Sequence, residues 1–173
     1  MAEVKLNPMK TIRLEKVVLN IAVGAAGERL EKAAKVLKEI TGQEPALRKA
    51  KKSVRDFGIH RGENIAAMVT LRKSRAVEVL KQLVQTKGAG ISPSSFDKNG
   101  NLAFGIREHI DIPGAKYDPD IGIFGMDVVA HLTKPGYRVR TRRMGRPIGE
   151  PQRVSREDAI EFFKNRIGVQ VME

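Results

Sequence analysis

The sequence has no cysteine and no tryptophan, and only 5% of its 173 residues are aromatic. Because cysteine is absent, the chain has no disulfide, no thiol nucleophile and no zinc site with thiolate ligands. No apolar run approaches the roughly 18 residues of a membrane span, and residues 1–10 lack the apolar core of a signal peptide. These absences predict a cytoplasmic protein that has no membrane partner.

Carboxylates are absent from two short basic segments. Residues 48–55 (RKAKKSVR) hold five Lys or Arg, and residues 134–146 (KPGYRVRTRRMGR) hold six. The formal net charge is +12, so these segments carry eleven of the twelve excess charges. A charged segment is often only a solvated loop, but two acid-free segments in one small chain favour a partner with a phosphate backbone.

The length and the 41% hydrophobic content suffice for a single domain over residues 1–173, which buries roughly 70% of its unfolded surface. Three segments carry no regular pattern. Residues 1–11 are predicted to be an N-terminal arm, residues 48–64 a basic finger loop, and residues 134–150 a basic extension. The extension contains several Pro and Gly residues, which are incompatible with a regular helix.

Periodicity predicts the regular elements. Alternating apolar residues indicate strands at 12–23, around 46–47, and at 65–71, 102–109 and 125–132, with a short edge strand at 169–171. Apolar stripes indicate helices at 28–41 and 75–86 and a last helix after Ser155. Gly42 is expected to end the first helix, and Ser74 and Ser155 are expected to cap the other two.

Strands and helices do not alternate regularly along the chain. This order predicts an α+β fold, in which helices pack on one face of an antiparallel sheet and basic loops project from it. The other face is then free for RNA. Asn20 and Thr70 are polar residues within apolar strands, and there they are either hydrogen-bonding groups or ordinary solvent-facing residues. Phe57, near the finger tip, either stacks on a nucleotide or packs the loop against its own domain.

Short motifs along the whole chain resemble ribosomal protein L-five of the large subunit. They include NPM at 7–9, EKVVLN at 15–20, AKKS at 50–53, FGI at 57–59, VTLR at 69–72, EHID at 108–111, YDP at 117–119 and GMDV at 125–128. Each motif is short, but their order and spacing together are specific. Residues 104–128 and the segment KPGYRVRTRR resemble the archaeal and eukaryotic branch of the family.

The resemblance implies a structural role in the ribosome. Proteins of this family anchor 5S ribosomal RNA (5S rRNA) in the central protuberance, contact large-subunit rRNA and the P-site transfer RNA (tRNA), and meet neighbouring large-subunit proteins and a small-subunit head protein. The positions expected to bind rRNA are Lys10, Arg13, Lys16, Asn20, Gln43, Arg48, Thr70 and Arg72. The positions expected to contact tRNA are Lys49, Lys51, Lys52, Ser53, Arg55, Phe57, His60 and Arg61. Further RNA contacts are expected from Lys134, Arg138, Arg140, Arg142, Arg143 and Arg146.

A magnesium-dependent RNA-processing enzyme is the alternative. Asp118, Asp120, Asp127 and His131 are the side chains that would hold the metal ion. However, Asp118 and Asp120 flank a proline, where aspartate commonly bonds to the backbone of a turn, and a histidine in an alternating strand is usually structural. We therefore expect no catalytic activity, no metal site and no cofactor.

Overall fold

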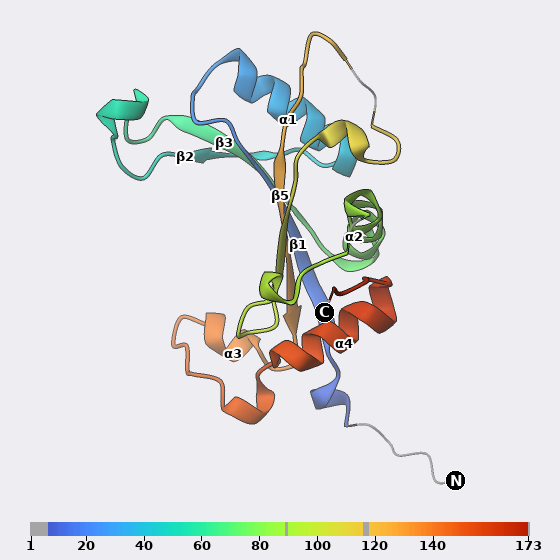
Figure 1. The fold of residues 1–173 in the computed structure, drawn as a ribbon. Coiled ribbons are helices and arrows are strands. Elements are labelled where there is room, and N and C mark those ends of the chain that lie inside the picture. Colours follow the sequence, from blue (N-terminus) through green and yellow to red (C-terminus); the bar gives the residue numbers. More distant parts are fainter. Residues whose placement is uncertain (1–6, 89, 116–117, 173) are drawn as a thin grey trace.

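The protein is described from a computed structural model, which defines residues 7–88, 90–115 and 118–172 (Figure 1). The strands are β1 (Arg13–Ala22), β2 (Ala46–Lys49), β3 (Asn64–Leu71), β4 (Leu102–Ile106) and β5 (Met126–Thr133). The helices are α1 (Glu28–Thr41), α2 (Lys73–Lys87), α3 (Arg138–Thr141) and α4 (Arg156–Ile167). The five strands form one antiparallel sheet in the order β2-β3-β1-β5-β4, which confirms the predicted α+β fold.

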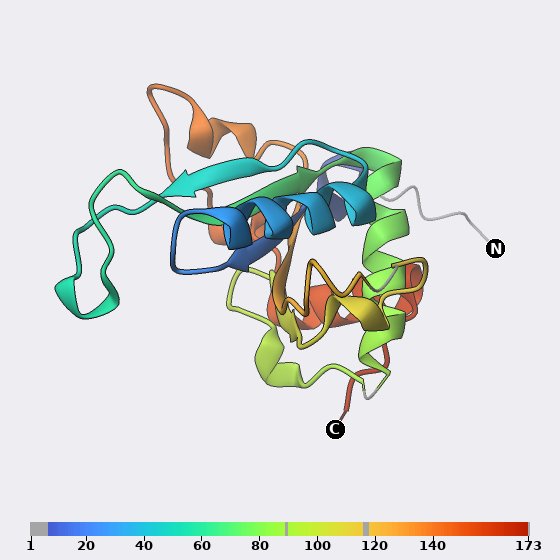
Figure 2. The same cartoon turned by 90° about the horizontal axis from the view of Figure 1, so that it is seen from above.

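One face of the sheet is buried under helices. In β1, Val17, Leu19 and Ile21 are buried, whereas the residues between them are at least partly exposed, because successive side chains of a strand point to opposite faces. Helix α1 packs on β3, α2 packs on β1 and β4, and α4 lies against α2 (Figure 2). We call the opposite side of the sheet the open face.

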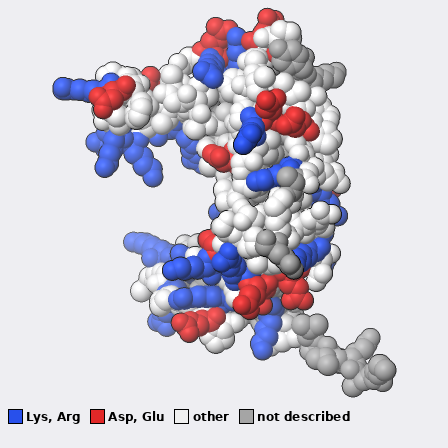
Figure 3. All heavy atoms as spheres, in the orientation of Figure 1, with Lys and Arg blue, Asp and Glu red and all other residues white. Residues whose placement is uncertain are grey.

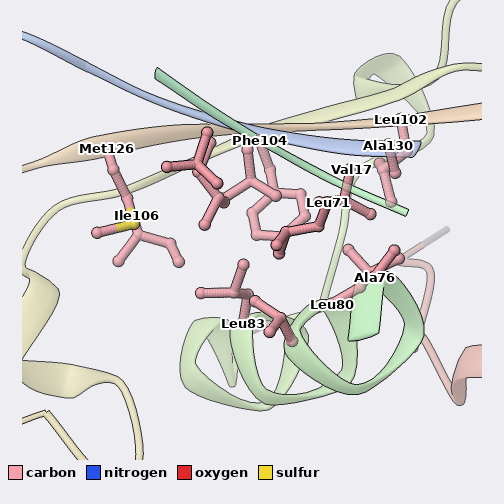
Figure 4. Close-up of a cluster of buried hydrophobic side chains, with 14 of the residues drawn as sticks. Val17, Leu71, Ala76, Leu80, Leu83, Leu102, Phe104, Ile106, Met126 and Ala130 are labelled. Carbon is pink, nitrogen blue, oxygen red and sulfur yellow. The ribbon is translucent and has the colours of Figure 1, made fainter. Parts of the chain in front are cut away.

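The core lies between the sheet and α2 (Figure 4). Leu80 and Leu83 of α2 are buried together with Leu71 of β3 and Phe104 of β4. Burying each such side chain contributes about 1.5–3 kcal/mol, so this layer fixes the sheet as a rigid platform for whatever projects from it. None of the helices in the described ranges has the length and the apolar composition that a membrane span needs.

Two helix limits agree with the sequence. Helix α1 covers residues 28–41, and Gly42 ends it in the left-handed conformation with its N–H donating to the carbonyl of Lys38. Ser155 caps α4 as predicted, because its hydroxyl accepts from the N–H of Asp158 while the Asp158 carboxylate accepts from the N–H of Ser155.

The predicted start of α2 is wrong. The helix begins at Lys73, and Ser74 lies inside its first turn without capping it. Leu71 is buried as the last residue of β3, and Ala76 must reach the same core, so the chain has to turn within two residues. It does so through Lys73, which adopts φ +60°, a left-handed conformation that is rare for residues other than glycine.

Three other predictions are corrected. The strand predicted at 102–109 ends at Ile106, because the chain turns there and buries His109 in a short 3₁₀ turn. Residues 169–171 form no strand of the sheet, since only an isolated bridge pairs Val171 with Ile91. The basic extension contains one helical turn, α3. Of the predicted arm, residues 1–6 lie outside the described residues, and the part after Asn7 forms a short 3₁₀ turn at Pro8–Lys10.

Candidate RNA interface

The basic finger, residues 48–64, is a hairpin that carries the chain from β2 to β3 beyond the edge of the sheet (Figure 2). At its base the N–H of Ala50 donates to the carbonyl of Glu63 (2.8 Å), and the N–H of Gly62 donates to the carbonyl of Ala50 (2.9 Å). Nearer the tip, Val54 and Ile59 exchange two backbone hydrogen bonds of 2.9 and 3.1 Å. The finger thus satisfies many of its own backbone groups, and its side chains are left to face outward.

Local contacts also hold the tip. Gly58 has φ +63° and donates its N–H to the carbonyl of Arg55, so the tip turns at a position that favours glycine. The N–H of Arg61 donates to Ser53 Oγ (2.9 Å), and the N–H of His60 donates to Glu63 Oε2 (2.9 Å). The carboxylate of Glu63 is therefore bound within the finger, and Asp56 is the one exposed acid among the exposed Lys and Arg of residues 48–64.

The finger brings together all eight positions expected to contact tRNA, and their side chains are exposed. Phe57 is 76% exposed, so the interpretation in which it packs the loop against its own domain is wrong. Because the ring is exposed at the tip of a cationic hairpin, stacking on a nucleotide remains the prediction for Phe57.

The basic extension, residues 134–150, is a second projection that bonds to itself and to the body. The N–H of Arg146 donates to the carbonyl of Val139, and a Cβ at Gly145 would lie only 2.7 Å from the carbonyl oxygen of Arg140. The hydroxyl of Tyr137 accepts from the N–H of Val154 (2.9 Å). Every arginine of the extension that is expected to bind RNA is exposed: Arg138, Arg140, Arg142, Arg143 and Arg146.

Lys134 differs from these arginines because its side chain is only 11% exposed. Its ammonium donates to the carbonyl of Arg153 (2.9 Å) and to Asp158 Oδ2 (3.3 Å). Beside it, the amide of Gln152 donates to the carbonyls of Met9 (2.8 Å) and Pro135 (2.7 Å). We propose that Lys134 braces the extension against α4 and leaves RNA contact to the arginines.

The open face lies between these two projections. Figure 3 shows Lys and Arg gathered on both projections, with a surface that carries few charges between them. In the sheet register Asn20 is opposite Met68 and Asp127, and Thr70 is opposite Val18. Asn20 and Thr70 are half-buried and alternate with core residues, so both belong to the open face.

The other positions expected to bind rRNA are spread over the strands and the ends of the sheet. Lys10 and Arg13 lie at the end near the extension, since Gln152 joins Met9 to Pro135 and Arg13 pairs with Thr133. Arg48 pairs with Ala66 at the finger end of the sheet, while Gln43 follows the C-terminus of α1. Lys16 lies opposite His131, and Arg72 follows β3. Gln43 and Arg72 are exposed, and Lys16 is half-buried.

A polar network crosses the sheet at the extension end. The side-chain amide of Asn101 donates to Asp97 Oδ2 (2.6 Å), which turns Asn101 Oδ1 toward Nδ1 of His131. Nδ1 must therefore carry the proton, because an amide oxygen only accepts hydrogen bonds. The other ring nitrogen, Nε2, lies 3.5 Å from Glu15 Oε2, and Arg72 lies 3.5 Å from the other oxygen of Glu15. Glu15 and His131 of this network line one side of a groove of about 600 Å³, and the basic extension lines the other side.

Partial burial of His131 lowers its pKa below the usual value near 6.5, and the carboxylate of Glu15 opposes this shift without reversing it. A histidine with a lowered pKa binds fewer protons in the folded chain than in the unfolded chain. The stability that it contributes is therefore present above pH ~6.5 and is lost as the pH falls toward its folded-state pKa.

We predict that His131→Gln weakens the pH dependence of stability in this window. The free energy of unfolding by urea, measured between pH 5 and 7.5, should fall less steeply for the variant than for the wild type as the pH decreases, because the variant lacks the titrating ring. His60→Gln removes an exposed imidazole from the finger and is the matched control. A wild-type slope that His131→Gln leaves unchanged would contradict the assignment.

The residues of the enzyme alternative are not brought together. Asp118 and Asp120 form a turn in which the N–H of Asp120 donates to Asp118 Oδ1 (3.0 Å). Asp127 lies at the start of β5, whereas His131 lies further along the strand beside Asn101 and Glu15. Within residues 7–88, 90–115 and 118–172, no group of three or more His, Asp or Glu side chains is placed to hold a metal ion.

Comparison with known proteins identifies the family. Residues 7–60 match the model for ribosomal protein L5, and residues 64–164 match the model for the C-terminus of the same ribosomal protein family. The chain belongs to the ribosomal protein L5 family. The boundary between the two matched segments falls at the base of the basic finger, and β1 of the first segment pairs with both β3 and β5 of the second. In this L5-family chain one sheet therefore runs through both segments.

Several archaeal relatives are similar over nearly their whole length. The proteins described as large ribosomal subunit protein uL5 from Pyrobaculum aerophilum, Sulfurisphaera tokodaii and Aeropyrum pernix are 55%, 49% and 48% identical to the chain. The alignments cover 97%, 100% and 96% of this chain, and 94%, 99% and 88% of the relatives. These relatives agree with the archaeal character of the motifs.

Sequence reasoning did not find the network around His131 in this L5-family chain. Its members Glu15, Asn101 and His131 come from three segments far apart in the sequence, and the pairing of β5 with β1 on one side and with β4 on the other brings them together. One signal was available, because the alternation in residues 125–132 places Asp127 and His131 on the same face as each other. The registers that bring β1 and β4 beside His131 are long-range properties, which the local pattern does not contain.

Proposed function

We propose that the chain is a structural constituent of the large ribosomal subunit in the cytoplasm, where it binds 5S rRNA and anchors it in the central protuberance. The open face and the residues at its ends bind 5S rRNA and large-subunit rRNA. The basic finger contacts the P-site tRNA, and the basic extension makes further RNA contacts. Neighbouring large-subunit proteins and a protein of the small-subunit head are the remaining partners, and residues 1–173 act as a single domain.

The charge distribution on the folded surface carries this proposal. Two cationic projections lie on either side of an open face with few charges, and α1 and α2 cover the other side of the sheet. Lys and Arg on the projections can neutralise phosphates and release counterions, while the half-buried polar groups between them meet the RNA at short range. The proposed role is structural and not catalytic, because the relatives are ribosomal proteins and because Asp118 accepts from the N–H of Asp120 in a local turn.

The first test measures binding of the purified chain to 5S rRNA at several KCl concentrations. If six to ten phosphates are engaged, affinity falls by about a thousandfold or more between 50 and 200 mM salt. Affinity that does not change with added KCl would overturn the proposal, because ion release would then contribute nothing to binding.

The second test places a bulky apolar side chain on the open face. Thr70→Leu should weaken 5S rRNA binding about tenfold or more, because RNA groups that face Thr70 lose a partner and are held away. The circular dichroism spectrum should remain that of the wild type, since Thr70 faces away from the core. Loss of the spectrum together with binding would place Thr70 in the core and contradict its role in RNA contact.

A further inference from the structure

The middle of the open face carries a single acidic side chain. One row across the sheet consists of Ala46, Met68, Asn20, Asp127 and Gly105, and the next consists of Thr70, Val18, Val129 and Ala103. Asp127 is exposed and lies between the buried residues Met126 and Val128, so its carboxylate points to the open face. In a chain of net charge +12, this carboxylate lies where the proposed function brings polyanionic RNA.

The carboxylate of Asp127 has no internal partner in the described ranges. The ion pairs there use Glu15, Glu28, Glu44 and Asp158 as their acids. The strand next to it offers Gly105, and a Cβ built there would lie 3.9 Å from Asp127 Oδ1, so the carboxylate projects over a position that has no side chain. Its oxygens are therefore free to accept hydrogen bonds from outside the chain.

Contact with RNA would remove water from this carboxylate. A desolvated and unpaired charge is costly, and nearby phosphates add repulsion, so a carboxylate at this place weakens binding unless the RNA supplies hydrogen-bond donors. Among the bases, guanine presents two adjacent donors on one edge, N1–H and the exocyclic N2 amine, and their spacing fits the two oxygens of a carboxylate. Adenine and cytosine each offer one amine there, and uracil offers one N–H.

Asn20 completes the match to guanine. It lies directly opposite Asp127 on the same face, a relation in which the Cβ atoms of neighbouring strands are about 4.5–5.5 Å apart. Its amide can donate to O6, the acceptor next to N1–H on the same edge of guanine, while Asp127 accepts from N1 and N2. Ala22, Ala103 and Gly105 surround the pair with small residues and leave room for a base.

We propose that Asp127 and Asn20 form a recognition site for an unpaired guanine of the bound RNA. This inference rests on the proposed binding of RNA to the open face and adds base specificity to it. Loops and bulges of folded RNA are where a base exposes this edge, and sequence-specific RNA recognition mostly targets such positions. The sequence analysis considered Asp127 as a metal ligand in the enzyme alternative. In this proposal its carboxylate instead distinguishes guanine from the other bases.

Asp127→Asn tests the site because it keeps the size of the side chain while removing the charge and one acceptor. Binding to 5S rRNA should weaken about ten- to a hundredfold, whereas binding to an unrelated RNA, such as a polyuridine, should become a few-fold tighter because a repulsive charge has gone. Glu161→Gln removes the same charge from the exposed surface of α4 and is the matched control. It should not weaken binding to either RNA. If Asp127→Asn, like Glu161→Gln, weakens binding to neither RNA, Asp127 is only a surface charge and the proposal fails.

Analogue interference locates the base. A 5S rRNA pool in which inosine phosphorothioate replaces a small fraction of the guanosines lacks one N2 amine per modified molecule. Selection with the wild-type chain should exclude inosine at one unpaired position, and selection with Asp127→Asn should not. A parallel pool with deoxyguanosine should show no interference that depends on Asp127. Interference by deoxyguanosine alone would assign the carboxylate to a ribose hydroxyl and overturn the guanine site. If the wild-type chain binds 5S rRNA no better than polyuridine, the proposed function itself fails.

Discussion

Replacing Lys51, Lys52 and Arg55 with alanine is expected to weaken binding of the chain to tRNA about ten- to a hundredfold near 0.1 M salt, while binding to 5S rRNA stays within a few-fold of the wild type. The three side chains are exposed on the basic finger, which projects beyond the sheet edge and keeps its own backbone hydrogen bonds. Each phosphate contact that is lost removes about one released counterion. The plot of log affinity for tRNA against log salt should therefore become shallower, and the magnitude of its slope should fall by about two to three.

The control variant removes three positive charges elsewhere. Lys81 on α2 and Lys164 and Arg166 on α4 are exposed on the side of the sheet that the helices cover. Their replacement with alanine changes the net charge by the same amount, so it separates an effect of the finger from an effect of overall charge. Equal loss of tRNA binding in the two variants, or equal loss of tRNA and 5S rRNA binding in the finger variant, would refute a separate tRNA surface.

Most strands of the sheet and several helix limits could be predicted because the patterns that determine them are local. The alternation of residues 125–132 predicted β5 and its buried face, and Gly42 and Ser155 marked helix ends through their own backbone and side-chain chemistry. The start of α2 could not be predicted from Ser74, because the burial of Leu71 and Ala76 on both sides of the turn places it. Tertiary packing prevailed over a local capping preference there.

The candidate interface divides in the same way. Its cationic projections were visible as acid-free runs, because charge is a local property of the sequence. The burial of Lys134 against α4 could not be predicted, since its partners Arg153 and Asp158 lie about twenty residues further along the chain. Pairing of Asn20 with Asp127 depends on the register between β1 and β5, and a shift of one residue would have placed either of them in the core.

Phe163→Ala is expected to have the largest effect on stability. Phe163 is fully buried in α4, with ring centroids 5.7 Å from Phe96 and 5.8 Å from Phe162. Truncating a buried phenylalanine removes its transfer free energy and leaves a cavity, which together cost about 3–5 kcal/mol. For a chain of this length, the midpoint of thermal unfolding should fall by roughly 6–20 °C. Urea unfolding at constant pH measures the free energy directly.

Phe162→Ala is the matched control. The ring of Phe162 lies beside that of Phe163 but is only half-buried, so its removal should lower the free energy of unfolding by less. The loss at Phe163 also extends to the basic extension, since Asp158 of the same helix binds both the N–H of Ser155 and the ammonium of Lys134. At temperatures where Phe163→Ala is still folded, amide hydrogen exchange in residues 134–150 should therefore accelerate more than in the finger. A variant that loses stability without this difference would show that the extension is held independently of α4.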